Sequence, residues 1–348
     1  MNSSRRRLMS YGETIRQTLH HAMDRDPSVL VMGIGVDDHK AVFGSTLGLS
    51  KDFGTRRVID TPISEAAMTG VAIGAAVGGM RPVHVHMRCD FLYLAMDQLM
   101  NLAAKWSYMF GGRMSVPLVV RCVIGRSWGQ GAQHSQSLQS FFMHVPGIKV
   151  VMPTTSADVQ GLLLAAIADP NPVLVIEHRL LYGIQGMVPS VFRAAPFGQT
   201  HVRRTGKDVT VVANSYLVVE ALKAAEFLSR HGIDIEIVDP VSLVPLNAGP
   251  IVESVRKTGR ALVTDTSWVS CGTSAEIAAL IAEKAWDRLR VPLRRLGNAP
   301  ATCPVSQPLE KAFYPDAWKI TRNVFEMMGR KFPEGKWKDD DIQFKGPF

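Results

Sequence analysis

A carboxylate at the expected start of a helix is the first residue in this sequence that could do chemistry. Residues 60–65 read Asp-Thr-Pro-Ile-Ser-Glu, and the proline and serine mark a helix start with Glu65 in its first turn. Glycines follow at positions 70, 74 and 78, so one helix face is nearly bare. Two interpretations stay open, because Glu65 can also simply complement the helix dipole and the glycines can simply pack.

A histidine in a glycine-rich loop is the second candidate. Residues 131–137 read Gly-Ala-Gln-His-Ser-Gln-Ser, just beyond an expected strand at 117–122. Folds of the α/β class place ligands beyond the carboxyl ends of their strands, which favours a functional His134. Loop hydrogen bonds could equally explain this histidine.

Other short motifs match catalytic signatures only in part. Residues 125–129 fit the nucleophile elbow of serine hydrolases around Ser127, but the glycines at 129 and 131 prolong a loop where the elbow must enter a helix. Residues 33–35, Gly-Ile-Gly, lack the third glycine of a dinucleotide fingerprint. The adjacent histidines at 20/21 point apart, and the pair at 84/86 shares a strand face with no obvious third ligand, so core or loop histidines are expected at these positions.

Length and composition limit the class of protein that must position these residues. The chain has 348 residues, of which 46% are hydrophobic and 20% charged, so two globular domains are expected. The net charge of +8 is spread thinly, and neither nucleic acid nor a membrane is an expected partner. Four cysteines lie far apart without a C-x-x-C pair, and no signal peptide is visible, so a cytoplasmic protein is expected.

Short β-branched runs alternate with helical segments, which is typical of α/β proteins with largely parallel sheets. Strands are expected at 29–32, 58–59, 83–85, 117–122, 150–152 and 173–176, and helices at 11–24, 65–79, 94–109 and 156–168. Residues 183–207 lack sustained periodicity and read as a linker. Beyond it, strands are expected at 209–213, 234–238, 261–264 and 293–296, and helices at 216–230, 248–258 and 274–288.

Several of these segments together resemble one family. They are the segment 60–70, Met-Asp-Gln-Leu-Met-Asn-Leu-Ala-Ala-Lys at 96–105, Tyr-Met-Phe-Gly-Gly at 108–112, Ala-Gln-His-Ser-Gln at 132–136 and Pro-Gly-Ile-Lys-Val-Val at 146–151. In this order they resemble the beta subunit of the thiamine-diphosphate-dependent first component of 2-oxo-acid dehydrogenase complexes. The acetoin dehydrogenase version looks closest, because Glu-His-Arg-Leu-Leu-Tyr-Gly-Ile-Gln-Gly at 177–186 resembles its approach to the linker.

The resemblance implies a transketolase-like fold of two α/β domains with largely parallel sheets. Its parts would be a pyrimidine-binding domain over 1–185, a linker over 186–206, a transketolase C-terminal-like domain over 207–328 and an irregular arm over 329–348. The family's Gly-Asp-Gly segment for the diphosphate and Mg²⁺ is absent here and lies on the alpha subunit in two-chain members. An α₂β₂ heterotetramer is therefore implied, with a lipoyl acyltransferase core and a 2-oxo acid or acyloin as further partners, and the glycine face at 70–78 would lie at a subunit contact.

The resemblance also gives the candidate residues their roles. A carboxylate at Glu65, hydrogen-bonded to a ring nitrogen of the cofactor's aminopyrimidine, would stabilise the tautomer that removes the thiazolium proton. Phe91 matches the aromatic residue that stacks on the aminopyrimidine, and Met87 belongs to the same cofactor-binding set. His134 matches the active-site histidine that handles protons or steers the acceptor. A potassium site made mostly of backbone carbonyls is implied at Leu118, Ala166, Ile167, Asp169 and Asn171.

Three departures from the family pattern put its usual substrate and acceptor in doubt. Ile34 stands where the family has an acid after its first strand, Arg88 lies in an otherwise apolar or neutral approach to Phe91, and Asp239-Pro240 replaces Asp-Leu-Arg. Arg88 could recognise an acidic substrate, or it could face the surface. A non-oxidative transketolase-type carbon–carbon ligase and a catalytically silent scaffold therefore remain alternatives.

Overall fold

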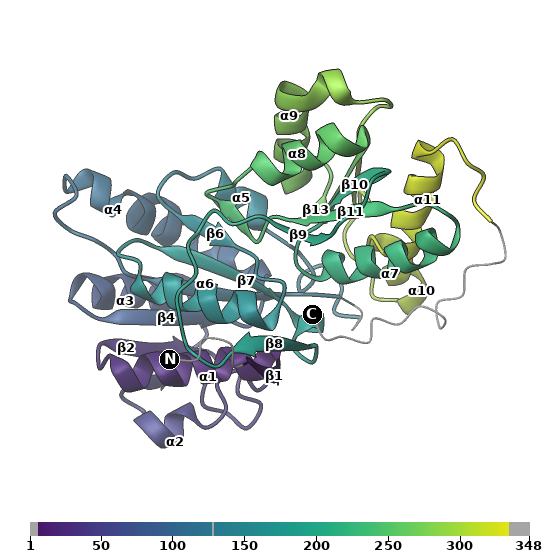
Figure 1. Ribbon diagram of the computed structural model, residues 1–348. Helices are drawn as coiled ribbons and strands as arrows, with labels where there is room; N and C mark the ends of the chain where they lie inside the picture. Colours follow the sequence, from purple (N-terminus) through teal and green to yellow (C-terminus); the bar gives the residue numbers. More distant parts are fainter. Residues whose placement is uncertain (1–5, 127–128, 334–348) are drawn as a thin grey trace.

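The computed structural model describes residues 6–126 and 129–333, which form two α/β bodies (Figure 1). The strands of the larger sheet are β2 (Val29–Gly33), β3 (Val58–Asp60), β4 (Arg81–His86), β5 (Val119–Ile124), β6 (Lys149–Val151), β7 (Val173–His178) and β12 (Ser242–Val244). Within the described residues this sheet has the order β12-β6-β7-β5-β4-β2-β3. All neighbours run parallel except β12, which is antiparallel to β6.

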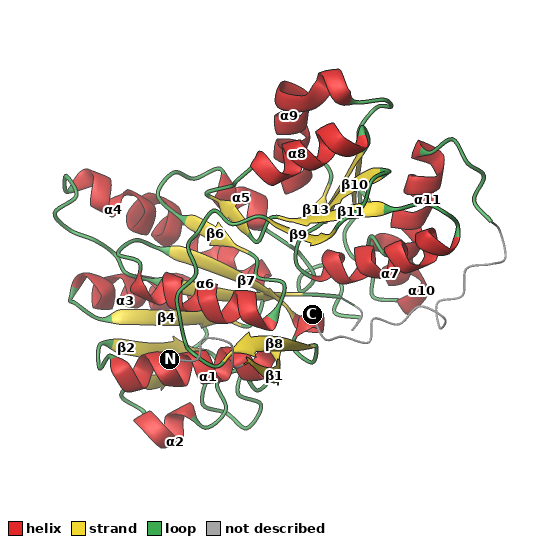
Figure 2. Ribbon diagram, in the orientation of Figure 1, coloured by secondary structure: helices red, strands yellow, loops and turns green. Residues whose placement is uncertain are grey.

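Helices cover both faces of this sheet, which explains why its central strands are apolar throughout rather than alternating. Strands β2, β5 and β7 are buried along their whole length. Over one face, α1 (Tyr11–Arg25) and α6 (Ser156–Ala168) lie side by side (Figure 2) and bury Ile15, Leu19 and Leu163. The other face is covered by α3 (Glu65–Val77), α5 (Gln139–Met143) and the segment from Cys89 to Met109.

The segment expected as one helix over 94–109 has three different helical geometries. It consists of a 3₁₀ helix, η1 (Cys89–Ala95), a π-helix, η2 (Asp97–Ala103), and α4 (Ala104–Met109). Unusual hydrogen-bonding registers of this kind often occur near functional sites. The apolar spacing predicts the helix but not its register, because all three geometries can bury residues such as Leu99.

The smaller sheet belongs to the second half of the chain. Its strands are β9 (His201–Arg204), β10 (Val209–Val212), β11 (Ile235–Asp239), β13 (Ala261–Trp268) and β14 (Arg294–Asn298), in the order β14-β13-β10-β11-β9 within the described residues. One face packs on α7 (Tyr216–Arg230) and α11 (Ala317–Met327), and the other on α8 (Gly249–Thr258) and α9 (Thr273–Ala285). The shorter elements are α2 (Leu49–Phe53), α10 (Gln307–Phe313), η3 (Arg179–Leu181) and η4 (Trp286–Arg288).

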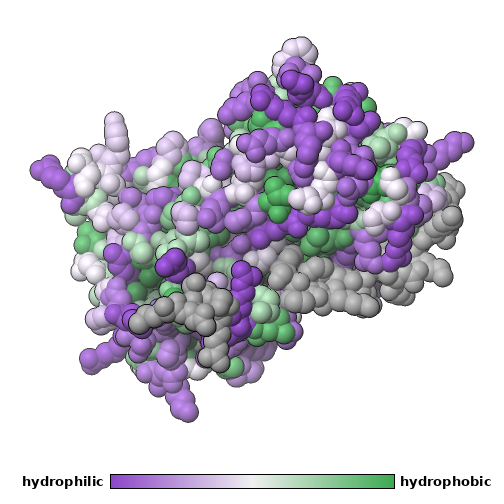
Figure 3. Space-filling model, in the orientation of Figure 1, coloured by the Kyte–Doolittle hydropathy of each residue, from purple (hydrophilic) through white to green (hydrophobic). Residues whose placement is uncertain are grey.

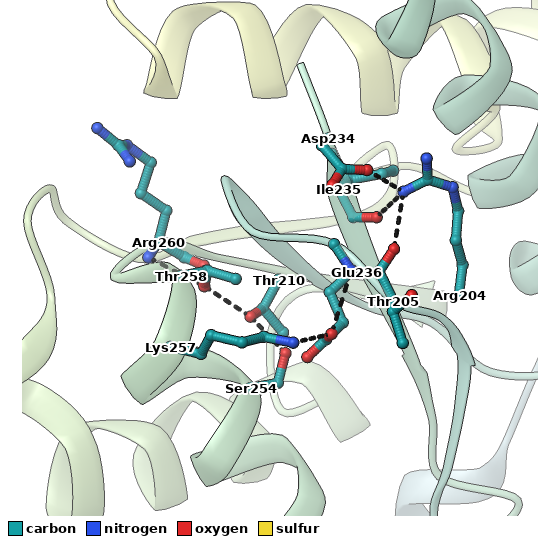
Figure 4. A network of polar contacts seen from close by, with 11 residues as sticks. Arg204, Thr205, Thr210, Asp234, Ile235, Glu236, Ser254, Lys257, Thr258 and Arg260 are labelled. Carbon is teal, nitrogen blue, oxygen red and sulfur yellow. Dashed lines mark hydrogen bonds and ion pairs between the residues drawn. The ribbon is translucent and has the colours of Figure 1, made fainter. Parts of the chain in front are cut away.

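The segment expected as a linker joins the two sheets and carries two strands of its own. Strand β8 (Gln185–Pro189) pairs antiparallel with β1 (Arg6–Ser10), and β9 pairs antiparallel with β11. Arg204 at the end of β9 donates to Asp234 at 2.6 Å and to the Thr205 carbonyl at 3.1 Å (Figure 4). Both strands are too short to give a periodic pattern, and their partners lie far away in the sequence, so only the tertiary structure reveals them.

The molecular surface and the ends of the described chain contribute little to the position of a functional site. On the face shown in Figure 3, hydrophilic residues cover most of both bodies and apolar residues appear in small groups. No helix in the ranges 6–126 and 129–333 combines the length and apolar character that crossing a membrane requires. Of the expected C-terminal arm, only residues 329–333 are described, and they form no helix or strand.

Candidate active site

A cavity of about 520 Å³ lies at the carboxyl ends of neighbouring strands of the larger sheet. Ile34 follows β2, Thr61 follows β3, Met87 follows β4 and His134 lies in the loop after β5, and all four line the cavity. This edge of a parallel sheet is where α/β proteins bind ligands. The four residues predicted for catalysis and cofactor binding, Glu65, Met87, Phe91 and His134, share this cavity.

The backbone before Glu65 is held in place by hydrogen bonds and close strand packing. Asp60 at the end of β3 accepts a hydrogen bond from the Gly35 amide at 2.6 Å, which ties the loop after β2 to the approach to α3. Gly33 has φ +152°, and a Cβ there would lie 2.3 Å from the Val85 carbonyl oxygen. Gly33 therefore allows a close contact between two strand backbones, and Gly35 allows the turn that follows. These two roles explain why the sequence contains only part of a dinucleotide motif.

Phe91 and His134 form a direct contact inside the cavity. Their rings meet edge to face with centroids 5.2 Å apart and an interplanar angle of 82°. The adjacent Asp90 accepts hydrogen bonds from the Gln136 amide at 3.0 Å and from its side chain at 3.1 Å. Burial raises the pKa of Asp90, while the Gln136 bonds lower it in part. Asp90, which lies in η1, thus anchors the loop that contains Gln136 and His134.

The histidines of β4, which were expected in the core or in a loop, supply polar surface to the cavity. His84 and His86 are buried, line the cavity and meet edge to face at 4.3 Å. Burial lowers the pKa of His84 to about 4 and that of His86 well below its ordinary value. Both rings are therefore neutral at pH 7. The described residues contain no group of three or more His, Cys, Asp or Glu side chains suited to a metal.

Arg88 and Lys40 are cationic residues of the same cavity. Arg88 is only 7% exposed, so the surface-facing interpretation of this residue is wrong. The alternation of the expected strand at 83–85 does not reach residue 88, and β4 ends at His86, so no pattern in the sequence decided between the two interpretations of Arg88. Nothing in the sequence marked Lys40 as a cavity residue, because the loop after β2 has neither a periodic pattern nor a recognisable motif.

The residues of the implied potassium site gather where α6 ends near the start of β5. Ile167 accepts a hydrogen bond from Arg81 at 2.8 Å through its carbonyl, and the Leu118 carbonyl accepts one from the Val173 amide at 2.9 Å. The Asp169 carboxylate accepts from Lys149 at 3.0 Å and from the Asn171 amide at 2.9 Å. Potassium would have to share the Ile167 carbonyl with the Arg81 guanidinium.

Two further sequence features are located as follows. Ser127 of the elbow-like motif lies outside the described residues, and the helix after this loop begins only at Gln139. The glycine face of α3 is open in the single chain, because a Cβ built at Gly70 or Gly74 would have no atom within 4 Å. Ile63, just before this helix, is 81% exposed.

Comparison with known proteins assigns the chain to a family. Residues 7–185 match the transketolase pyrimidine binding domain and residues 198–320 match the transketolase C-terminal domain. A solved structure named "Split gene transketolase, inactive beta4 tetramer" has the same fold, with a TM-score of 0.73 and 21% identity over 93% of this chain and 99% of that one. The expected transketolase-like fold of two α/β domains is confirmed.

Relatives of much higher identity narrow the assignment. The acetoin:2,6-dichlorophenolindophenol oxidoreductase subunit beta of Cupriavidus necator is 40% identical over 90% of this chain and 96% of its own length. The pyruvate dehydrogenase E1 component subunit beta of Rhizobium meliloti is 39% identical over 91% of this chain and 69% of its own length. The chain therefore belongs to the beta subunits of the thiamine-diphosphate-dependent acetoin and pyruvate dehydrogenases, as its sequence motifs predicted.

Proposed function

We propose that the chain, paired with an alpha subunit, activates thiamine diphosphate for decarboxylation of a 2-oxo acid or cleavage of an acyloin. The acyl fragment would pass to a lipoyl group on an acyltransferase core. The observation that carries this proposal is that Glu65, Phe91 and His134, which come from three separate segments, line one cavity. The names of the relatives above support acetoin or pyruvate as the substrate type.

The cavity suits the pyrimidine half of the cofactor. Its volume of about 520 Å³ falls within the range of small-molecule sites. Phe91 offers an aromatic surface, Met87 and Val85 offer apolar surface, and Glu65 offers a carboxylate. When bound, the cofactor supplies the carbon nucleophile for the substrate carbonyl.

The cavity residues Glu65, Phe91, Met87 and His134 have distinct tasks in the proposed reaction. Glu65 accepts a hydrogen bond from a pyrimidine nitrogen and stabilises positive charge there, because an anion is needed to favour the protonated ring. Phe91 and Met87 hold the ring by stacking and apolar contact. His134, positioned by the contact with Phe91, donates or accepts a proton beside the substrate carbonyl.

The proposal extends to the rest of the assembly. We propose that the alpha subunit supplies the Mg²⁺ ligands and that the open face of α3 at Gly70 and Gly74 lies at a contact of an α₂β₂ heterotetramer. The same proposal includes a potassium ion at the five-residue set named above, from Leu118 to Asn171. It also places the domain boundaries at residues 185 and 207 and the protein in the cytoplasm. The four cysteines are all free, which agrees with a reducing compartment.

The substitution Glu65→Gln in the assembled enzyme tests the central role. Turnover should fall at least about 100-fold, because glutamine keeps the shape of the site but supplies no anion. Glu253→Gln, on the exposed side of α8, is the matched control and should keep full activity. Unchanged activity of Glu65→Gln would instead favour a catalytically silent subunit.

A transketolase-type ligase remains the second candidate because Ile34 lines the cavity where the family pattern has an acid. Product analysis with and without a lipoyl acceptor separates the two functions. A dehydrogenase needs the acceptor to release its acyl product, whereas a ligase forms a new carbon–carbon bond without it.

A further inference from the structure

The described lining residues of the cavity all come from the first half of the chain, between Ile34 and His134. The second half nevertheless contacts the segment that carries His134, which runs from Gly129 to Gln139. Helix α5 begins at Gln139 and lies at the junction of the two bodies (Figure 1). The second half can therefore act on the cavity without lining it.

At the end of this segment, Gln139 is bound by a buried carboxylate of the second half. Its side-chain amide donates to Asp265 Oδ1 at 2.8 Å and to the Thr266 hydroxyl at 3.1 Å. Neither Gln139 nor Asp265 has any exposed surface. Loss of the amide donor would therefore leave a buried acceptor short of a partner.

Asp265 is itself fixed by the backbone of the second half. It lies in β13 and accepts hydrogen bonds from the Ser267 amide at 3.1 Å and from the Ser274 amide, at the start of α9, at 2.8 Å. Burial raises the pKa of Asp265, and the hydrogen bonds from both backbone amides and from Gln139 oppose this shift. The acceptor for Gln139 is thus attached to a strand and a helix rather than to a loop.

At the beginning of the segment, two glycines pack beneath Val305 of the second half. Gly129 and Gly131 have φ of +63° and +69°, and Cβ atoms there would lie 3.2 Å from the Val305 carbonyl oxygen and 2.8 Å from its Cγ2 atom, respectively. Glycine suits both the left-handed backbone and this close approach. Gln130, between the two glycines, lines the cavity. The second half therefore confines the segment on both sides of His134.

The first half holds the same segment at one further point, where Asp90 accepts two hydrogen bonds from Gln136. His134 thus lies in a segment that each half of the chain fixes through a carboxylate. We propose that Gln139, held by Asp265 of the second half, is a positioning residue for His134. This inference rests on the proposed function in one respect, because it takes His134 to act on the substrate.

Positioning of this kind should affect the rate rather than binding. A displacement of about 1 Å at a reacting group can lower a rate about 100-fold, while contacts elsewhere in the site are kept. Glu65 belongs to α3, which no contact of Gln139 reaches. Activation of the cofactor through Glu65 should therefore be independent of Gln139, whereas proton transfer by His134 should not.

Gln139→Met in the assembled enzyme removes the amide donor, and Asp265 keeps its two backbone donors. We expect kcat to fall about tenfold and KM to change less than about twofold. Gln160→Met is the matched control, since Gln160 is a buried glutamine of α6, on the other face of the larger sheet, and donates to the Pro189 carbonyl at 3.3 Å. The control should keep the wild-type kcat. An unchanged kcat in Gln139→Met would overturn the inference.

Combined variants show whether Gln139 acts through His134. In the His134→Ala background, Gln139→Met should lower kcat by less than about twofold, because the group that it positions is absent. Asp265→Asn with Gln139→Met should cost no more than the larger of the two single losses, because both changes break the same bond. A further loss of about tenfold in the His134→Ala background would contradict a positioning role.

The position of His134 can also be measured without turnover. In a crystal structure of the assembled Gln139→Met variant, the His134 ring should leave its edge-to-face contact with Phe91, whose centroid is 5.2 Å away in the wild type, while Phe91 and Glu65 stay in place. An undisturbed contact would reject the positioning role and leave the proposed function intact. A displaced His134, together with full activity of Glu65→Gln, would support the positioning role and reject the proposed function instead.

Discussion

The rings of Phe91 and His134 meet edge to face, 5.2 Å apart, although one comes from η1 and the other from the loop after β5. The neighbouring Asp90 and Gln136 are joined by two hydrogen bonds, so the two segments are held together beside the contact. The residue expected against the cofactor and the residue expected beside the substrate are therefore positioned as one unit.

His134→Ala should slow acyl transfer more than it weakens cofactor binding. The imidazole is expected beside the substrate carbonyl, so its loss removes proton transfer, an effect of about 100-fold or more on kcat. Steady-state rates and the cofactor dissociation constant of the assembled enzyme check this. A collapse of cofactor affinity at a normal kcat would mean that His134 is misplaced.

Asp90→Ala should lower activity through the loop that carries His134. The Gln136 amide and side chain would lose their acceptor, and we expect about a tenfold fall in kcat from the displaced histidine. Asp90→Asn keeps one carbonyl acceptor and should retain more activity than the alanine variant. Asp287→Asn, at an exposed site in the second half, is the control. Full activity of Asp90→Ala would exclude this positioning role.

The chain alone should bind thiamine diphosphate weakly. Most of the affinity should come from the diphosphate, held through a divalent ion that needs hard oxygen ligands. Glu65 and Phe91 contribute roughly 2 to 4 kcal/mol together, which corresponds at best to millimolar binding. Titration calorimetry of the chain with magnesium should show little heat, and an alpha subunit should restore tight binding. Micromolar binding by the chain alone would place the diphosphate site here.

The ion pair between Arg121 and Glu177 should be a sensitive point of stability. Both side chains are fully buried, with Arg121 Nε 2.6 Å from the carboxylate, and Glu177 also accepts a hydrogen bond from Tyr182. Arg121→Met leaves a buried carboxylate without its cation and should cost about 3 to 5 kcal/mol in urea unfolding. The double variant Arg121→Met/Glu177→Leu should recover part of this loss. Equal losses in the single and double variants would argue against an uncompensated charge as the cause.

Histidines in the cavity should make stability depend on pH. His84 has a pKa of about 4 in the folded chain against an ordinary 6.5, because burial disfavours its charged form. The unfolded state therefore binds more protons between these values, and stability falls as pH drops from 6.5 toward 4. From pH 7 to pH 5, His84→Met should lose about 2 kcal/mol less than wild type in urea unfolding. Parallel losses in both proteins would show that His84 does not contribute.

Local patterns in the sequence determined most of the secondary structure and the main candidate residues. Helices α6 and α7 occupy the predicted ranges 156–168 and 216–230, because the preference of a run of residues for a helix acts within a few positions of the chain. The capping box of Thr155 with Asp158 is a local interaction of this kind. Glu65 likewise lies at the first position of α3, as the preceding proline and serine predicted, although the Ser64 side chain makes no capping hydrogen bond.

Only the tertiary structure decided which strands pair with one another and which residues line the cavity. Strand β12 joins the larger sheet from beyond the connecting segment, and β8 and β9 depend on partners that are distant in the sequence. Arg88, Lys40 and Ile34 share a cavity because β2 and β4 are neighbours in space while β3 lies at the sheet edge. Strand order depends on long-range packing, whereas a sequence pattern reports only which residues prefer burial, and this is why the motif residues were predictable and their charged neighbours were not.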